Sequence, residues 1–186
     1  MIEVPRNVVG GNDMKMKIAA LVLIVLLPVL AVTATYATKP GIGHGTVTLV
    51  SSTPVGTSRP ADGNTIAMFK QTFSLTGTLA GTAVALERDV THISGDRSFT
   101  TFHGEANFTA SNGEASSGTL VIRYVGINNG TFVHGQFVIV RNSGTDSFAD
   151  FHGQGSFSGK AGIGVAMDYT LKWHIDPASP KTKTAA

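Results

Sequence analysis

Alternating apolar and polar positions run through most of the chain after residue 39 and predict β-strands. The pattern is clearest near the C-terminus, where one strand face carries only apolar side chains: Val165, Met167, Tyr169, Leu171, Trp173 and Ile175. Similar stretches are separated by segments rich in Gly, Asn, Asp and Ser, which favour turns. We expect eight strands, at 44–51, 65–76, 80–91, 98–109, 117–125, 131–141, 146–158 and 164–175.

Most connections between these stretches are short, and they predict how the strands are arranged. Asn-Gly pairs such as Asn112-Gly113 and Asn129-Gly130 favour turns between antiparallel neighbours. A parallel crossover would need about a dozen residues or more. Eight successive antiparallel strands tend to close into a barrel, because closure removes the exposed sheet edges. The predicted fold is all-β: a single eight-stranded antiparallel meander barrel of calycin-like type, preceded by one N-terminal hydrophobic helix.

An internal repeat relates residues 98–108 to residues 147–157, with six of eleven positions identical. In both copies large and small residues alternate on one face, as a packed barrel lumen requires. His103 and His152 fall on the opposite face. The structural interpretation is a duplicated strand motif with outward histidines. The functional alternative makes His103 and His152 a paired site on neighbouring strands.

The segment 18–32 contains fifteen residues without a polar side chain, follows Lys15 and Lys17, and precedes small residues. This order is typical of a secretory signal peptide, with cleavage after Ala34 or Ala37. An uncleaved membrane anchor is the alternative, although a spanning helix needs about 20 apolar residues. Both place the rest of the chain outside the cytoplasm. We therefore expect three parts: 1–37 (extension plus signal or anchor), 38–176 (barrel) and 177–186 (disordered tail).

The start of translation stays open between Met1, Met14 and Met16, and Met14 gives the more ordinary signal peptide. Asn107 and Asn129 begin glycosylation sequons, which matter only for an exported chain in a host with the machinery. The oligomeric state is not defined by the sequence.

Composition removes several functional classes. The 186-residue chain has no cysteine, which excludes thiol catalysis, disulfides and iron–sulfur ligation. Its net charge of +2, from 14 basic and 12 acidic residues, is too balanced for a nucleic-acid partner. A membrane contact is expected only through an uncleaved N-terminal segment. Charged residues are only 14% of the chain, so uncharged polar side chains must carry much of the outer face.

No catalytic motif has the required spacing, so we assign no catalytic residue and no cofactor. The six histidines are scattered singly, and we expect no metal site. Glu87 and Asp89 share one face of their strand. We interpret them as part of an exposed polar face rather than as an acid–base pair.

Several segments, in order, resemble a family of barrel domains of unknown function that is related in fold to plant allene oxide cyclase. These are Phe73-Ser-Leu-Thr-Gly77, Gly118-Thr-Leu-Val-Ile122, Phe137-Val-Ile-Val-Arg-Asn-Ser-Gly-Thr145, Phe151-His-Gly-Gln-Gly155 and Asp168-Tyr-Thr-Leu-Lys-Trp-His-Ile-Asp176. The resemblance implies an eight-stranded barrel with a lumen, and it implies no activity. The cyclase's catalytic residues find no matching motif in this chain.

Three functional hypotheses remain. The barrel binds a small apolar ligand in its lumen, or it is an isomerase or cyclase of a lipophilic substrate, or it is a structural barrel with a filled core. An outer-membrane barrel is disfavoured, because the predicted outer face carries charged side chains such as Asp168 and Lys172. Arg88 is the candidate to hold a substrate carboxylate, if it points inward. The lumen candidates are Phe102, Phe108, Phe151, Phe157, Tyr169, Trp173 and Arg88.

Overall fold

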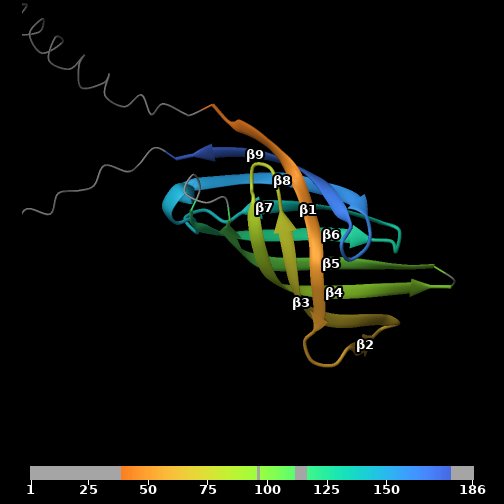
Figure 1. The fold of residues 1–186 in the computed structure, drawn as a ribbon. Helices are drawn as coiled ribbons and strands as arrows, with labels where there is room; N and C mark the ends of the chain where they lie inside the picture. The colour runs from red at the N-terminus through yellow and green to blue at the C-terminus, as the bar shows by residue number, and fades with distance from the viewer. Residues whose placement is uncertain (1–38, 96, 112–116, 177–186) are drawn as a thin grey trace, which may run out of the picture. The chain divides into compact units, whose positions relative to one another are not determined.

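The computed structural model describes residues 39–95, 97–111 and 117–176, and every strand in them pairs with an antiparallel neighbour (Figure 1). The predicted apolar segment 18–32 and the tail 177–186 lie outside the described residues. The elements are β1 (Gly41–Pro54), β2 (Arg59–Ala61), β3 (Asn64–Leu75), β4 (Gly81–Ser94), β5 (Arg97–Ala110), β6 (Thr119–Asn128), β7 (Phe132–Ile139), a 3₁₀ helix (Asp146–Phe148), β8 (Phe151–Lys160) and β9 (Ala166–Ile175).

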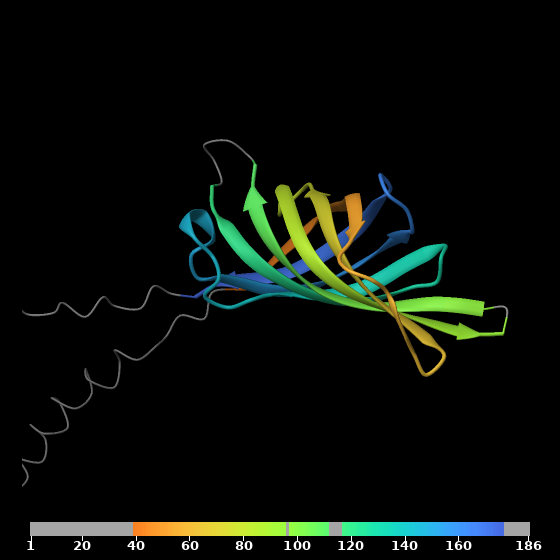
Figure 2. The ribbon, with the colours of Figure 1, turned by 90° about the horizontal axis from the view of Figure 1, so that it is seen from below.

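Eight of these strands close into a barrel. The order runs β1-β9-β8-β7-β6-β5-β4-β3, and β1 then pairs with β3, from Val47 opposite Leu75 to Pro54 opposite Phe69. The register of this closing pair shifts between Leu49 and Ser51, which bends β1 so that it can reach both neighbours. Figure 2, turned from the first view, shows the curved strands and the β4–β5 hairpin extending beyond the rest. Among the described residues, no helix is long and apolar enough to span a membrane.

The predicted all-β antiparallel barrel is confirmed, and the strand limits differ locally. The sequence pattern missed β2, which extends the β3 edge as a short hairpin from Arg59 opposite Ile66. It also predicted a strand from residue 146, where the structure has the 3₁₀ helix. Asp146 and Asp150 have φ values of 52° and 60°, and this left-handed backbone interrupts an extended chain.

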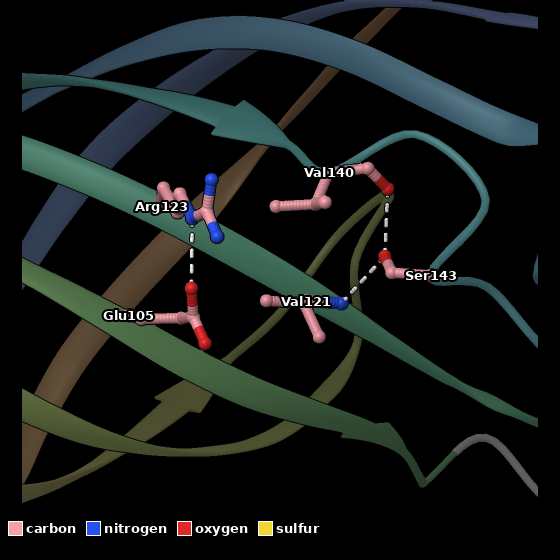
Figure 3. A network of polar contacts seen from close by, with 5 residues as sticks. All are labelled: Glu105, Val121, Arg123, Val140 and Ser143. Atoms are coloured by element: carbon pink, nitrogen blue, oxygen red, sulfur yellow. Dashed lines mark hydrogen bonds and ion pairs between the residues drawn. The ribbon is translucent and has the colours of Figure 1, made fainter.

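Polar contacts on the outer face tie neighbouring strands together (Figure 3). Arg123 Nε on β6 donates to Glu105 Oε2 on β5 at 2.7 Å. The Ser143 hydroxyl donates to the Val140 carbonyl at 2.7 Å and accepts the Val121 amide at 2.9 Å. The hydrogen bond from the Val121 amide to Ser143 extends the pairing of β6 past Ile139, the last residue of β7.

Aromatic side chains close one end of the barrel, next to the 3₁₀ helix. Phe148 from that helix packs edge-on against Phe108 at a ring-centroid distance of 5.8 Å and against Phe151 at 5.5 Å. Phe151 in turn stacks on Trp173 at 5.2 Å. Phe108 is fully buried, and Leu79 beside it in the core is 1% exposed. This cluster forms a solid floor beneath the lumen.

Tyr169 fastens the β3–β4 connection to this end. Its hydroxyl accepts the Leu79 amide at 2.8 Å and donates to the Thr76 carbonyl at 2.9 Å. The hydroxyl reaches the loop because Gly45, opposite Tyr169 on β1, has no side chain: a Cβ there would lie 2.6 Å from the Tyr169 oxygen. The loop therefore depends on one side-chain hydroxyl for two backbone hydrogen bonds.

We expect Tyr169→Phe to lower the free energy of unfolding by about 1–3 kcal/mol, because it leaves the buried Leu79 amide without a partner. Urea unfolding measures the change. Tyr124→Phe is the matched control, since the Tyr124 hydroxyl is buried without a hydrogen-bond partner. Equal losses in the two variants would contradict this role of Tyr169.

Candidate functional site: a cavity in the barrel lumen

A cavity of about 300 Å³ occupies the lumen above the aromatic floor. Its deep part is lined by buried residues such as Leu79 and Ala83. Its other end is lined by half-buried Ser52 and Asn128 and by exposed Gly162, at the strand ends remote from the 3₁₀ helix. The barrel is thus a cup, closed at one end and open at the other.

Cross-strand pairs of one aromatic residue and one glycine shape the cavity wall. Tyr124 on β6 lies opposite Gly104 on β5, and a Cβ at Gly104 would be 2.5 Å from the Tyr124 hydroxyl. Phe102 lies opposite Gly126 in the same way, with 2.3 Å between a Cβ at Gly126 and Phe102 Cζ. Each glycine lets the neighbouring ring pack closely over its backbone. These rings therefore line the space instead of filling it.

A polar group interrupts this apolar wall. The inward face of β4 starts with Gly81, Ala83 and Ala85 and continues with Glu87 and Asp89, because side chains alternate along a strand. Gln71 on β3 reaches Glu87, and its Nε2 donates to Glu87 Oε1 at 2.5 Å. Glu87 is 5% exposed and Gln71 is 7% exposed, so this pair lies inside the barrel.

Tyr124 brings a third polar group to the same place. It faces Glu87 across Gly104, since Glu87, Gly104 and Tyr124 occupy one row of the sheet. Its hydroxyl is close enough for each group to shift the pKa of the other, yet it makes no hydrogen bond of normal geometry. One oxygen of Asp89, Oδ1, is also buried without a partner. Tyr124 and Asp89 both line the cavity, and each carries one buried polar atom without a hydrogen-bond partner.

Burial, and secondarily the negative charge of Asp89, raises the pKa of Glu87 from 4.5 to about 8. Hydrogen bonding from Gln71 and contact with Tyr124 offset only part of this rise. The pKa of Asp89 is also raised, mainly by burial, although Glu87 and His103 lower it in part. The pKa of Tyr124 is raised by burial and by the nearby carboxyl groups. At neutral pH the carboxyl pair therefore retains a proton and can donate or accept hydrogen bonds.

The structure brings together only some of the predicted lumen residues. Phe102, Phe157 and Tyr169 line the cavity. Phe108, Phe151 and Trp173 belong to the floor instead.

Arg88, a lumen candidate only if it points inward, lies on the outer face, because Glu87 and Asp89 on either side of it line the cavity. Arg88 shares the outer face with Val84 and Leu86, which are 40% and 52% exposed. The interpretation of Glu87 as part of an exposed face is wrong for the same reason.

A histidine pair between the repeats is also ruled out, since β5 and β8 are separated by β6 and β7. His152 lies opposite His174 on β9, and His103 lies opposite Arg88 and Val125. The sequence contained one signal that could have placed Glu87 inside the barrel. The smaller apolar residues of β4, Ala83 and Ala85, are in phase with Glu87, and small residues suit a lumen crowded by rings.

The fold and the cavity define a class: closed antiparallel barrels with a cup-shaped lumen. Residues 42–173 match the family described as "Protein of unknown function (DUF3224)". The chain belongs to this family.

A search of solved structures adds a crystal structure of a DUF3224-family protein of unknown function from Shewanella oneidensis MR-1. That protein shares 13% sequence identity, with a TM-score of 0.57, covering 75% of this chain and 100% of the other. At this identity the similarity concerns the fold. No curated protein matches the chain.

The raised pKa of Glu87 predicts the direction in which the free energy of unfolding changes with pH. The folded chain holds this proton more tightly than the unfolded chain, so stability declines as pH rises from about 4.5 to about 8. Glu87→Gln removes that decline. We expect the unfolding free energy of the variant, relative to that of the wild type, to increase as pH rises across this window. The increase is up to about 1.4 kcal/mol for each unit by which the pKa of Glu87 differs between the folded and the unfolded chain.

Urea unfolding at pH 5, 6.5 and 8 measures this difference. Glu105→Gln, on the outer face of β5, corrects for the loss of one negative charge from the protein. A difference between wild type and Glu87→Gln that does not change with pH would show that Glu87 titrates as an ordinary exposed carboxyl.

Proposed function

We propose that this barrel binds a small, mainly apolar, uncharged molecule that carries one hydroxyl or carbonyl group. The observation that carries the proposal is the pair of unpartnered polar atoms, the Tyr124 hydroxyl and Asp89 Oδ1, in residues that line a mainly apolar cavity. Buried polar atoms are normally hydrogen-bonded, and a ligand oxygen placed between them would satisfy both.

The size of the cavity supports a ligand rather than a filled structural core. Its volume of about 300 Å³ is at the lower end of the range for small-molecule pockets. Protein interiors are normally packed with few voids larger than a water molecule. Aromatic contacts connect the side chains of the wall, since Phe102 lies between Tyr124 and Phe157 at ring-centroid distances of 6.2 and 6.3 Å. A preformed apolar wall reduces the entropy lost on binding.

The charge of the cavity supports the choice of an uncharged molecule. The carboxyl groups of Glu87 and Asp89 both lie in the wall, and the nearest basic side chain of β4, Arg88, points outward. A ligand carboxylate would be repelled by Asp89 and would have no cation to pair with. A hydroxyl can donate to Asp89 Oδ1 while accepting from Tyr124. A carbonyl can accept from Tyr124 and from protonated Glu87.

A second candidate is an isomerase or cyclase of a lipophilic substrate, in keeping with the allene-oxide-cyclase-like type expected from the sequence. The pKa of Glu87, about 8, favours it, because a general acid or base works best when its pKa is near the working pH. Asp89 beside it could receive or return the proton, as in other carboxyl pairs in which one group raises the pKa of its neighbour. Under both candidates we propose that the barrel acts outside the cytoplasm, as segment 18–32 indicates.

Binding is tested by calorimetric titration of the full chain with 2-naphthol and with naphthalene, which share a ring system and differ by one hydroxyl. We expect 2-naphthol to bind at least about 5- to 10-fold more tightly, since a single hydrogen bond contributes about that much. Tyr124→Phe removes one of the two proposed hydrogen bonds, so it should reduce that preference while leaving naphthalene binding in place. Thr170→Val, which removes a hydroxyl from the outer face, is the matched control and should behave as wild type.

Val133→Trp places a large ring at the mouth, where Val133 is half-buried, and should weaken both ligands. Absence of binding in the wild type, or binding undiminished by Val133→Trp, would contradict a lumen site.

The isomerase candidate predicts proton transfer to carbon. In deuterated buffer, the full chain should accelerate deuterium exchange next to the carbonyl of 1-indanone, and Glu87→Gln should abolish the acceleration. Nuclear magnetic resonance follows the exchange, with Glu105→Gln as the control. If naphthol binds but no exchange is accelerated, the barrel is a binding protein without this chemistry.

A further inference from the structure

A second cluster of polar residues lies on the outer face, where β8 and β9 pair near the closed end. His152 and His174 are directly opposite each other, with ring centroids 3.5 Å apart. Asp176 follows β9 two residues after His174, so the strand pleat places it on the same side. One ligand-type atom from each of His152, His174 and Asp176 lies within 4.8 Å of the others.

The surroundings of His152 fix which ring nitrogen faces the cluster. Its Nδ1 is 3.2 Å from the Asp150 carbonyl oxygen, which can only accept, so Nδ1 carries the hydrogen. In the neutral ring, Nε2 then presents a lone pair. That Nε2 is buried without a hydrogen-bond partner and lies 3.7 Å from Asp176 Oδ1. His152 as a whole is only 9% exposed, although it is on the outer face.

A lone pair that faces a carboxylate oxygen in a buried position is repulsive, and a cation between the two atoms turns the repulsion into attraction. A carbonyl that holds the other nitrogen of a histidine is also a common outer contact in metal sites, since it fixes the ring orientation. Two imidazoles and one carboxylate form a ligand set that suits zinc and similar divalent metals.

We propose that His152, His174 and Asp176 bind one divalent transition metal ion of the zinc type. Tetrahedral coordination at the usual bond lengths places ligand atoms about 3.3 Å apart, so the three atoms must close by at most about 1.5 Å. The side chains at the end of β9 can provide this movement, since His174 and Asp176 are only half-buried. Three protein ligands leave the fourth position to a water molecule.

Arg141 competes with the metal for Asp176. Its Nη2 is 3.6 Å from Asp176 Oδ2, whereas the metal is placed at Oδ1, and the Arg141 side chain is 65% exposed. Its positive charge repels a bound cation, and its attraction for the carboxylate competes with that of the metal. Without a metal, the same geometry serves as an ion pair between protonated His152 and Asp176. The two possibilities differ in what a metal titration shows.

The test uses the full chain, purified without a histidine tag and treated with chelator, and titrated with ZnCl₂ by calorimetry. We expect one equivalent to bind, with affinity reduced at least tenfold in His174→Gln and in Asp176→Asn. His134→Gln changes an exposed histidine of β7 outside the cluster and should leave the affinity within about twofold of wild type. The visible spectrum with Co²⁺ in place of zinc should show tetrahedral coordination, and each ligand variant should lose it.

Arg141→Gln gives a variant that leaves all three ligands in place, and it should increase zinc affinity. Circular dichroism identifies any ligand variant that fails to fold. Absence of one-to-one binding in the wild type overturns the proposal and leaves the ion pair. Binding that survives both His174→Gln and Asp176→Asn overturns it as well.

Discussion

The pairing of β1 with β3 is the contact on which the rest of the structure depends. It converts a twisted sheet with two edges into a closed barrel, and closure defines an inside and an outside. Without closure, the alternation along each strand would only distinguish the two faces of an open sheet. With it, one set of side chains meets across a lumen whose width is fixed by strand number and tilt. The bulge between Leu49 and Ser51 lets β1 serve both as the partner of β9 and as the closing strand.

Closure alone does not decide whether a lumen is filled, and the way in which the aromatic rings pack does. At the floor, Phe148 packs edge to face against Phe108 and Phe151, and none of the three lines the cavity. Higher up, Gly104 and its counterparts on neighbouring strands let the rings lie against the wall. A larger residue at such a position would push the ring into the lumen. The same aromatic content thus yields a packed end and an open end.

The sequence was sufficient for the class of fold, because period-two alternation and short Gly- and Asn-rich turns are local signals. It was insufficient for the phase of β4, where both faces are apolar in their first half. Val84 and Leu86 are the larger residues and would normally be assigned to the core. Because alternate residues of a strand share a face, that assignment also places Arg88 inside the barrel and Glu87 outside. The structure has the opposite phase: Ala83 lies inside, opposite Phe108 of β5, and the larger Val84 and Leu86 lie outside. Such a constraint between strands cannot be detected one strand at a time.

The carboxyl groups in the lumen are the feature on which the proposed function rests. Glu87 has lost most of its solvation, and only part of that cost is offset by Gln71. Desolvation disfavours the charged form of Glu87, so burial at this position carries a cost that an apolar residue would not have. Carboxyl groups with perturbed pKa values in a cavity are characteristic of binding and catalytic sites. Residues at such sites often stabilise the fold less than other residues at the same positions would. Closure supplies that scaffold, since the strand ladders and the aromatic floor stabilise the barrel independently of the wall at Glu87.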